Sequence, residues 1–207
     1  MSARIAALIS GRGSNLLAID DACRDGRLDA EVVLVLSNKP DAAGLVLAAE
    51  RGIQTQVVDH RAFSDRQAFD HAVGDALEAA SPDWVVLAGF MRVLGADLVA
   101  RWSGRMLNIH PSLLPRHPGL DTHQRVLDAG DAEHGASVHQ VTSELDAGPV
   151  VAQVRIPVLA GDSAATLSAR LLPLEHALYV DALSQCLSSD GAPFATPADR
   201  TELREDR

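Results

Sequence analysis

The sequence predicts an α/β fold, in which a Rossmann-like and mainly parallel sheet is flanked by helices and extended by antiparallel strands in the C-terminal third. Through the first two thirds of the chain, short apolar runs alternate with helix-type segments, which is typical of strand–helix–strand units. After residue 110 two strand-type runs follow each other without a long helix between them. This second pattern is typical of antiparallel strands added to a parallel sheet.

Five apolar runs are predicted as the parallel strands, at residues 5–10, 32–36, 53–58, 84–88 and 106–109. The helices predicted between them cover residues 15–24, 42–51 and 64–80. Ser64 and Gln67 form a candidate capping box at the start of the last helix, where apolar residues recur at helical spacing. Gly26 and Gly52 suit the position just after a helix end, because glycine adopts a left-handed conformation at low cost.

In the C-terminal third, strands are predicted at residues 136–141 and 150–157, separated by the turn-rich segment TSELDAGP. A final helix is predicted over residues 163–187, and Pro173, which has no amide hydrogen, is expected to kink it or shift its start. We expect a single domain over residues 1–189, which is a usual domain size. Residues 190–207 are rich in proline and charged residues and are expected to form a loosely ordered tail.

The formal net charge is -10 and the isoelectric point is about 5.1. This charge argues against nucleic acid as a partner, because nucleic-acid-binding proteins usually present a basic face to the phosphates. An anionic ligand must therefore meet a local positive site. No apolar run approaches the length of a membrane span, and Cys23 and Cys186 are far apart in the sequence. We expect a cytoplasmic protein with reduced thiols, no membrane contact and no bound metal.

The segment SGRGSNL, residues 10–16, lies between the first predicted strand and the first predicted helix. It lacks the third glycine of a dinucleotide-binding fingerprint and the Gly-Lys-Ser/Thr of a Walker loop. Gly11 and Gly13 still permit a tight turn, and Ser14 and Asn15 suit the start of a helix, whose free N–H groups attract anions. The segment therefore predicts either an anion site or a plain strand-to-helix turn.

The segment NIHPSLLP, residues 108–115, ends the fifth predicted strand. Alternation along a strand places Asn108 and His110 on the same side, at the carboxyl end where open α/β sheets bind ligands. A histidine and a neutral amide can together stabilise an oxyanion that develops at a carbonyl group. A lone histidine after a strand is more often a structural residue, but two donors on one side favour a catalytic site.

Asp146 lies in the turn between the two later strands, and a carboxylate near His110 would raise the pKa of the imidazole and orient the ring. The alternative is a simple turn aspartate, which is the more common case. The remaining histidines considered are assigned to structural or surface positions: His71, His134, His139 and His176. The sequence has no Gly-x-Ser-x-Gly motif, so serine hydrolase chemistry is not indicated.

Longer segments resemble the folate-dependent formyltransferases almost from end to end. They are ISGRGSNLLAI at 9–19, SNKPDAAGL at 37–45, PDWVVLAGFMRVL at 82–94, GRMLNIHPSLLP at 104–115, EHGASVHQVTSELDAGPVVAQ at 133–153 and EHALY at 175–179. NIHPSLLP marks the wider group, whereas GSNL and the lack of a second domain resemble the phosphoribosylglycinamide formyltransferases. The resemblance implies transfer of the formyl group of 10-formyltetrahydrofolate to the amino group of glycinamide ribonucleotide in purine biosynthesis, by a monomer or homodimer without a metal.

The resemblance also implies a place for each ligand. The ribonucleotide phosphate would be held by Gly13, Ser14 and Asn15, and its ribose would contact Glu175. The folate would lie against Arg66, Met91, Arg92, Val93, Leu94, Asn108, Thr142, Ser143, Glu144, Leu145 and Asp146, with Arg66 near the glutamate tail. Protonated His110 and the Asn108 amide would stabilise the oxygen of a tetrahedral intermediate, while Asp146 would keep His110 protonated and help to move a proton.

Three residues of this sequence depart from the pattern of the formyltransferases that it resembles. Arg12 stands where a small polar residue is frequent, Asp121 replaces a frequent histidine, and Pro173 lies close to Glu175. The change at Asp121 implies that His110 and Asp146 suffice for proton transfer.

Two classes of alternative function remain. A formyltetrahydrofolate hydrolase or a methionyl-tRNA formyltransferase is expected to carry an additional domain, which does not suit an acidic sequence of 207 residues. A non-catalytic nucleotide-binding regulator would leave Asn108, His110 and Asp146 without a shared task.

Overall fold

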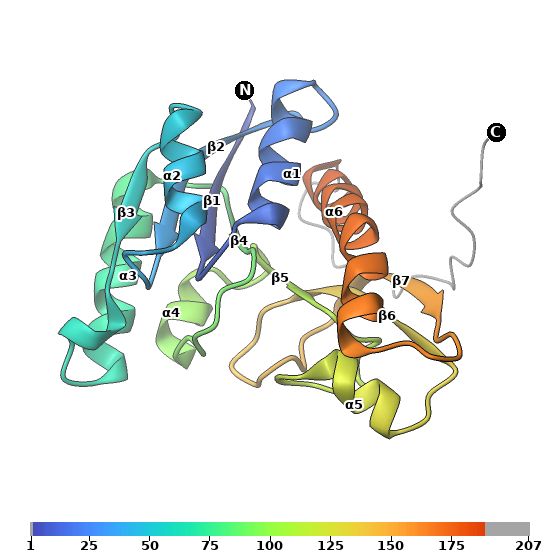
Figure 1. Cartoon of the computed structure of the whole chain (residues 1–207). Helices are drawn as coiled ribbons and strands as arrows, with labels where there is room; N and C mark the ends of the chain where they lie inside the picture. Colours follow the sequence, from blue (N-terminus) through green and yellow to red (C-terminus); the bar gives the residue numbers. More distant parts are fainter. Residues whose placement is uncertain (1, 189–207) are drawn as a thin grey trace.

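A seven-stranded sheet forms the centre of the molecule, in the order β3-β2-β1-β4-β5-β6-β7 (Figure 1). The computed structural model describes residues 2–188. The strands are β1 (Ala3–Ile9), β2 (Ala30–Ser37), β3 (Thr55–Val57), β4 (Trp84–Leu87), β5 (Met106–His110), β6 (Glu133–Gln140) and β7 (Val150–Pro157). The first five run parallel, whereas β6 is antiparallel to both β5 and β7. The predicted fold class is confirmed, and every predicted strand overlaps an observed one.

The helices are α1 (Ser14–Arg24), α2 (Ala43–Glu50), α3 (Arg66–Ala80), α4 (Ala96–Arg101), α5 (Thr122–Asp128) and α6 (Ala164–Ser188), with a 3-10 turn η1 (His60–Ala62). The predicted capping box of α3 is wrong, because the carboxylate of Asp65 caps this helix by accepting the Ala68 N–H at 2.9 Å. Gly26 and Gly52 follow α1 and α2 with φ of 81° and 77°, as predicted. The two short helices α4 and α5 were not predicted.

The two faces of the sheet carry separate hydrophobic cores. Along β1 the side chains of Ile5, Ala7 and Ile9 belong to one core, and those of Ala6 and Leu8 belong to the other. Helices α1, α2 and α6 cover the first face, while α3 and α4 cover the second. Strands buried on both faces read as continuous apolar runs, which is why the sequence pattern predicts them well.

Helix α6 begins at Ala164 and continues through Pro173, so the predicted shift of its start is wrong. Pro173 is exposed, whereas Leu171 and Glu175 on either side of it are buried. The predicted tail, residues 190–207, lies outside the described residues, and a single domain over residues 1–189 stays a prediction. Within residues 2–188, none of the helices is long and apolar enough to cross a membrane.

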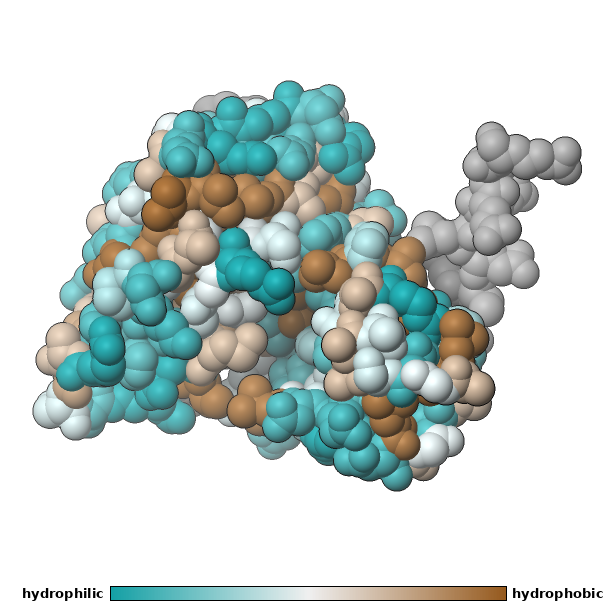
Figure 2. Space-filling model, in the orientation of Figure 1, coloured by the Kyte–Doolittle hydropathy of each residue, from teal (hydrophilic) through white to brown (hydrophobic). Residues whose placement is uncertain are grey.

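The strand order reverses at β1, which pairs with β2 on one side and with β4 on the other. In open α/β sheets the carboxyl ends of the strands around such a point form a natural crevice for ligands. Hydrophilic residues cover much of the face seen in Figure 2, and hydrophobic residues occur there in separate patches. The carboxyl ends of β1, β4 and β5 are therefore the expected place for a ligand site.

Candidate active site

A cavity of about 520 Å³ opens beyond the carboxyl ends of β4 and β5. Three segments provide most of its lining: residues 89–94 after β4, residues 119–123 before and within α5, and residues 141–146 between β6 and β7. Several large apolar side chains on these segments stay exposed and face the cavity, namely Met91, Val93, Leu120 and Leu145. Exposed apolar groups gathered around one hollow are typical of a ligand site.

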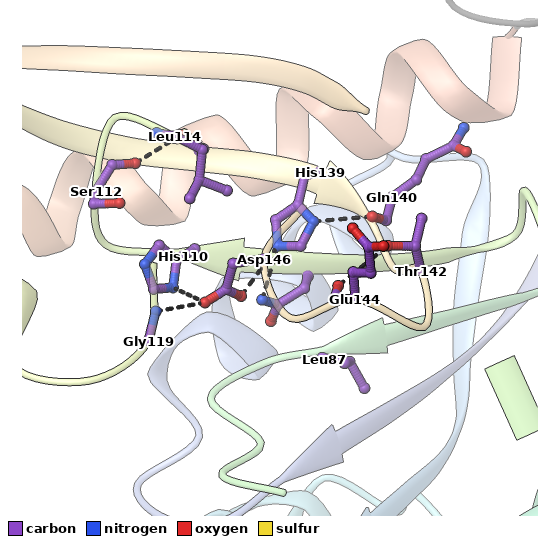
Figure 3. A network of polar contacts seen from close by, with 12 residues as sticks. Leu87, His110, Ser112, Leu114, Gly119, His139, Gln140, Thr142, Glu144 and Asp146 are labelled. Atoms are coloured by element: carbon purple, nitrogen blue, oxygen red, sulfur yellow. Dashed lines mark hydrogen bonds and ion pairs between the residues drawn. The ribbon is translucent and has the colours of Figure 1, made fainter. Parts of the chain in front are cut away.

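His110 is the last residue of β5, and its side chain is only 7% exposed. The Nε2–H of its ring donates to the main-chain oxygen of His117 at 3.0 Å. Its other nitrogen, Nδ1, lies 3.4 Å from Oδ2 of Asp146 (Figure 3). The structure thus brings together the histidine and the carboxylate that lie 36 residues apart in the sequence, as the sequence analysis anticipated.

The charge state of His110 differs from the prediction. Burial lowers the pKa of His110 below its ordinary value of 6.5, and this effect exceeds the opposite effects of the His117 oxygen and the Asp146 carboxylate. The effect of Asp146 has the predicted direction, since its carboxylate favours the charged ring, but removal of the ring from water disfavours the charged form more. At neutral pH the neutral form of His110 is favoured, with its proton on Nε2 and with the lone pair of Nδ1 beside the Asp146 carboxylate.

Asp146 is held in place by the main chain opposite. Its Oδ2 accepts the Gly119 N–H at 2.8 Å, which joins the β6–β7 turn to the loop before α5 (Figure 3). Burial raises the pKa of Asp146, but contacts with His139, the Gly119 amide and His110 lower it more, so the pKa lies below its ordinary value. The carboxylate is therefore ionised at neutral pH beside a ring that is neutral.

Asn108 lies on the same side of β5 as His110, as predicted, and its side chain contacts a residue that was assigned a structural role. Asn108 Nδ2 lies 3.1 Å from Nε2 of His139, which stands directly opposite Asn108 on β6. The Nδ1–H of His139 donates to the Gln140 oxygen at 2.9 Å, and its Nε2 also lies 3.6 Å from Oδ1 of Asp146. Asn108, His139 and Asp146 thus form one group of polar contacts at the wall of the cavity.

The folate-binding residues implied by the resemblance divide into two groups. Those that line the cavity are Met91, Arg92, Val93, Leu94, Asn108, Thr142, Ser143, Glu144, Leu145 and Asp146. Arg66 is not among the lining residues; it lies on α3 with its side chain 57% exposed and 3.9 Å from the Asp70 carboxylate. Asp70 in turn accepts the Gly95 N–H at 2.8 Å, so Arg66 lies just beyond the end of the 89–94 segment.

The loop before α1 forms a second, separate group. Gly13 has φ of 77° and caps α1 without a side-chain hydrogen bond, and the first turn of α1 contains no acidic residue. The free N–H groups at this helix start suit an anion. Asn15 and Glu175 are both 8% exposed, and they share a side-chain hydrogen bond between α1 and α6. Burial raises the pKa of Glu175 to about 7 despite that hydrogen bond.

The departures from the family pattern fall at different distances from the cavity. Asp121 lines it, and its main chain caps α5 with φ of 56°. His123 also lines it, and its Nδ1 lies 2.8 Å from Nε2 of the buried His134. Arg12 is exposed in the loop before α1. Neither His123 nor His139 was singled out from the sequence, because their place at the cavity depends on pairing between distant segments.

Comparison with known proteins agrees with this architecture. The Formyl transferase family model matches residues 3–183. Phosphoribosylglycinamide formyltransferase of Escherichia coli (strain K12) is 51% identical over 175 residues, which are 84% of this chain and 82% of that protein. The trifunctional purine biosynthetic protein adenosine-3 of Bos taurus is 48% identical over 181 residues, which are 87% of this chain and 18% of that protein.

Solved structures give the same result in three dimensions. The crystal structure of phosphoribosylglycinamide formyltransferase from Brucella melitensis has a TM-score of 0.85 to this chain at 45% sequence identity. The match covers 96% of this chain and 100% of that one. This chain belongs to the formyl transferase family, and within it to the phosphoribosylglycinamide formyltransferases.

Proposed function

We propose that this chain transfers the formyl group of 10-formyltetrahydrofolate to the amino group of glycinamide ribonucleotide, a step of purine biosynthesis. The main support is that Asn108, His110 and Asp146 meet at the wall of one cavity, with the Asp146 carboxylate 3.4 Å from the His110 ring. Transfer from a formyl carbon to an amine needs a donor for the oxygen that becomes negative and an acceptor for the amine proton. These three residues supply both groups.

The folate is assigned to the cavity. A volume of about 520 Å³ lies within the usual range for small-molecule sites. The apolar side chains of Met91, Val93 and Leu145 suit an aromatic ring system, and the peptide groups around them offer polar partners for its edge. Arg92, which lines the cavity, and Arg66, beyond its end, are the cations placed to meet a carboxylate of the glutamate tail.

The ribonucleotide is assigned to the loop before α1. The free amides of residues 13–15 would hold its phosphate at the positive end of the helix dipole. Glu175 lies beside Asn15 and would accept hydrogen bonds from the ribose hydroxyl groups. The two ligands would then approach each other from β1 and from β5, whose carboxyl ends face the same edge of the sheet.

In this proposal His110 begins neutral and acts as the proton acceptor. Nδ1 takes the proton of the attacking amine, because Nε2–H is already donated to His117. The ring becomes positive next to the ionised Asp146, which stabilises the new charge. The positive charge of the ring and an N–H of Asn108 would then stabilise the oxygen of the tetrahedral species, and removal of one hydrogen-bond donor to such an oxygen elsewhere costs roughly 2.7 to 4 kcal/mol. His110 finally returns the proton to the departing folate nitrogen.

A steady-state absorbance assay of the deformylated folate tests this proposal. We expect product with 10-formyltetrahydrofolate and glycinamide ribonucleotide together, and almost none when the ribonucleotide is omitted. Equal rates with and without the ribonucleotide would instead identify a formyltetrahydrofolate hydrolase. Absence of product under both conditions would favour a non-catalytic binding protein.

A further inference from the structure

The segment SNKPDAAGL, residues 37–45, has no role in the function proposed above. It connects β2 to α2 and does not line the cavity. Asn38 within it is only 1% exposed, which is unusual for an amide side chain and requires that its polar atoms find partners. Those partners lead from β2 to the wall of the cavity.

A chain of hydrogen bonds joins three neighbouring strand ends. The Ser10 hydroxyl, just after β1, donates to Asn38 Oδ1 at 2.5 Å. The same oxygen of Ser10 accepts the main-chain N–H of Met91, just after β4, at 2.7 Å. Met91 belongs to the 89–94 wall of the cavity. A buried side chain on β2 is thus connected, through one hydroxyl, to the main chain that lines the proposed folate site.

The direction of each hydrogen bond follows from the groups available. A serine hydroxyl has one hydrogen, and Asn38 Oδ1 takes it, so a lone pair of the Ser10 oxygen is turned toward the Met91 amide. Nδ1 of His60 on η1 donates to the main-chain oxygen of Asn38 at 3.0 Å and lies 3.2 Å from its amide nitrogen, so the His60 ring packs against Asn38. Asn38 therefore determines how the hydroxyl is oriented, and the hydroxyl determines where the Met91 amide lies.

The same segment also supports the loop before α1. The Gly44 N–H donates to the Gly11 oxygen at 3.0 Å. A Cβ at Gly44 would lie 2.6 Å from the Ile9 side chain and 3.1 Å from the Gly13 Cα, so only glycine permits this approach. This contact is made by main-chain atoms, however, and does not involve Ser10 or Asn38. The two supports can therefore be tested separately.

We infer that Ser10 and Asn38 are positioning residues that fix the Met91 amide and with it the 89–94 wall of the cavity. Neither residue lines the cavity, so both act through the main chain of the wall. This inference rests on the proposed function only for the identity of the ligand that the wall holds. Loss of the Ser10 hydroxyl leaves the partly buried Met91 amide without its acceptor, and the wall relaxes away from its binding geometry.

Ser10→Ala tests the inference, with Ser37→Ala as the matched control. Ser37 is fully buried in the same segment, but among residues 2–188 its hydroxyl bonds only to the main chain of Lys39. For Ser10→Ala we expect KM for 10-formyltetrahydrofolate to rise about tenfold, which corresponds to about 1.4 kcal/mol. KM for glycinamide ribonucleotide should change less than about twofold, and Ser37→Ala should change neither value. The ratio of the two KM values does not depend on the fraction of folded enzyme.

Hydrogen exchange at the Met91 amide gives a second measurement that does not depend on turnover. We expect this amide to exchange about tenfold faster in Ser10→Ala and in Asn38→Ala than in the wild type, and at the wild-type rate in Ser37→Ala. Unchanged exchange in Ser10→Ala, or an equal rise of both KM values, would overturn the inference. If the wild type transfers no formyl group, the proposed function fails, while the exchange rates still decide the inference.

Discussion

At the scale of single residues, His110 and Asp146 form a pair in which both pKa values lie below their ordinary values, which favours a neutral ring beside an ionised carboxylate. Burial keeps the imidazole neutral, while the contacts of Asp146 keep its carboxylate ionised. A neutral base beside a fixed negative charge gains a proton readily once an amine offers one. The sequence predicted that Asn108, His110 and Asp146 lie together at one candidate site, but not this charge state, since burial depends on residues that are distant in the chain.

The titration of His110 checks this charge state. We expect NMR of the histidine rings, assigned with His110→Ala, to place the midpoint of His110 below 6.5. The Asp146 charge raises the pKa of His110, so Asp146→Asn should move the midpoint lower still. Glu144→Gln removes an exposed charge from the same turn and should leave the midpoint unchanged. A midpoint above 6.5 in the wild type, or an upward shift in Asp146→Asn, would contradict this view of the pair.

At the scale of elements, the turn between β6 and β7 carries Asp146 to the end of β5. The two ends of this turn lie close together: the Gln140 N–H donates to the Pro149 oxygen at 2.9 Å, and Gly148 lies against the Gln140 main chain. Long apolar strands and the helices that cover them were predictable because their periodicity is local. The short helices α4 and α5 and the pairing of Asn108 with His139 were not, because tertiary contacts rather than local sequence determine them.

Gly148→Ala tests whether the close contact between the two ends of this turn stabilises the protein. A Cβ at Gly148 would lie 1.8 Å from the Gln140 oxygen, so the turn must move and Asp146 with it. We expect a loss of about 3 kcal/mol in the free energy of unfolding, measured with urea, at the upper end of usual overpacking costs. Gly104→Ala is the control: φ is 74° but a Cβ there meets nothing within 4 Å, so about 1 kcal/mol is expected. Equal losses for the two variants would show that the turn tolerates a side chain.

At the scale of the whole molecule, the strand order places the ends of β1, β4 and β5 at one edge of the sheet. This order brings the loop before α1, the 89–94 wall and His110 into one region. A chain of net charge -10 can still bind anionic ligands there, because helix N-termini and arginines supply positive potential locally. The hydrogen bonds that hold these loops in place could not be predicted from the sequence, because Ser10 contacts Asn38 and Met91, which lie 28 and 81 positions away.

The destination of the formyl group in wild type and His110→Ala tests whether this chain is a formyltransferase with His110 as its general base. With ¹³C-formyl-labelled 10-formyltetrahydrofolate, mass spectrometry should find the label on the amino group of glycinamide ribonucleotide. His110→Ala should lower the rate of label transfer roughly 100-fold or more, which is the usual contribution of a general base, while ribonucleotide binding survives. Near-normal label transfer by His110→Ala would contradict the role of His110 as general base. Release of the label as formate by the wild type would contradict the proposed formyl transfer.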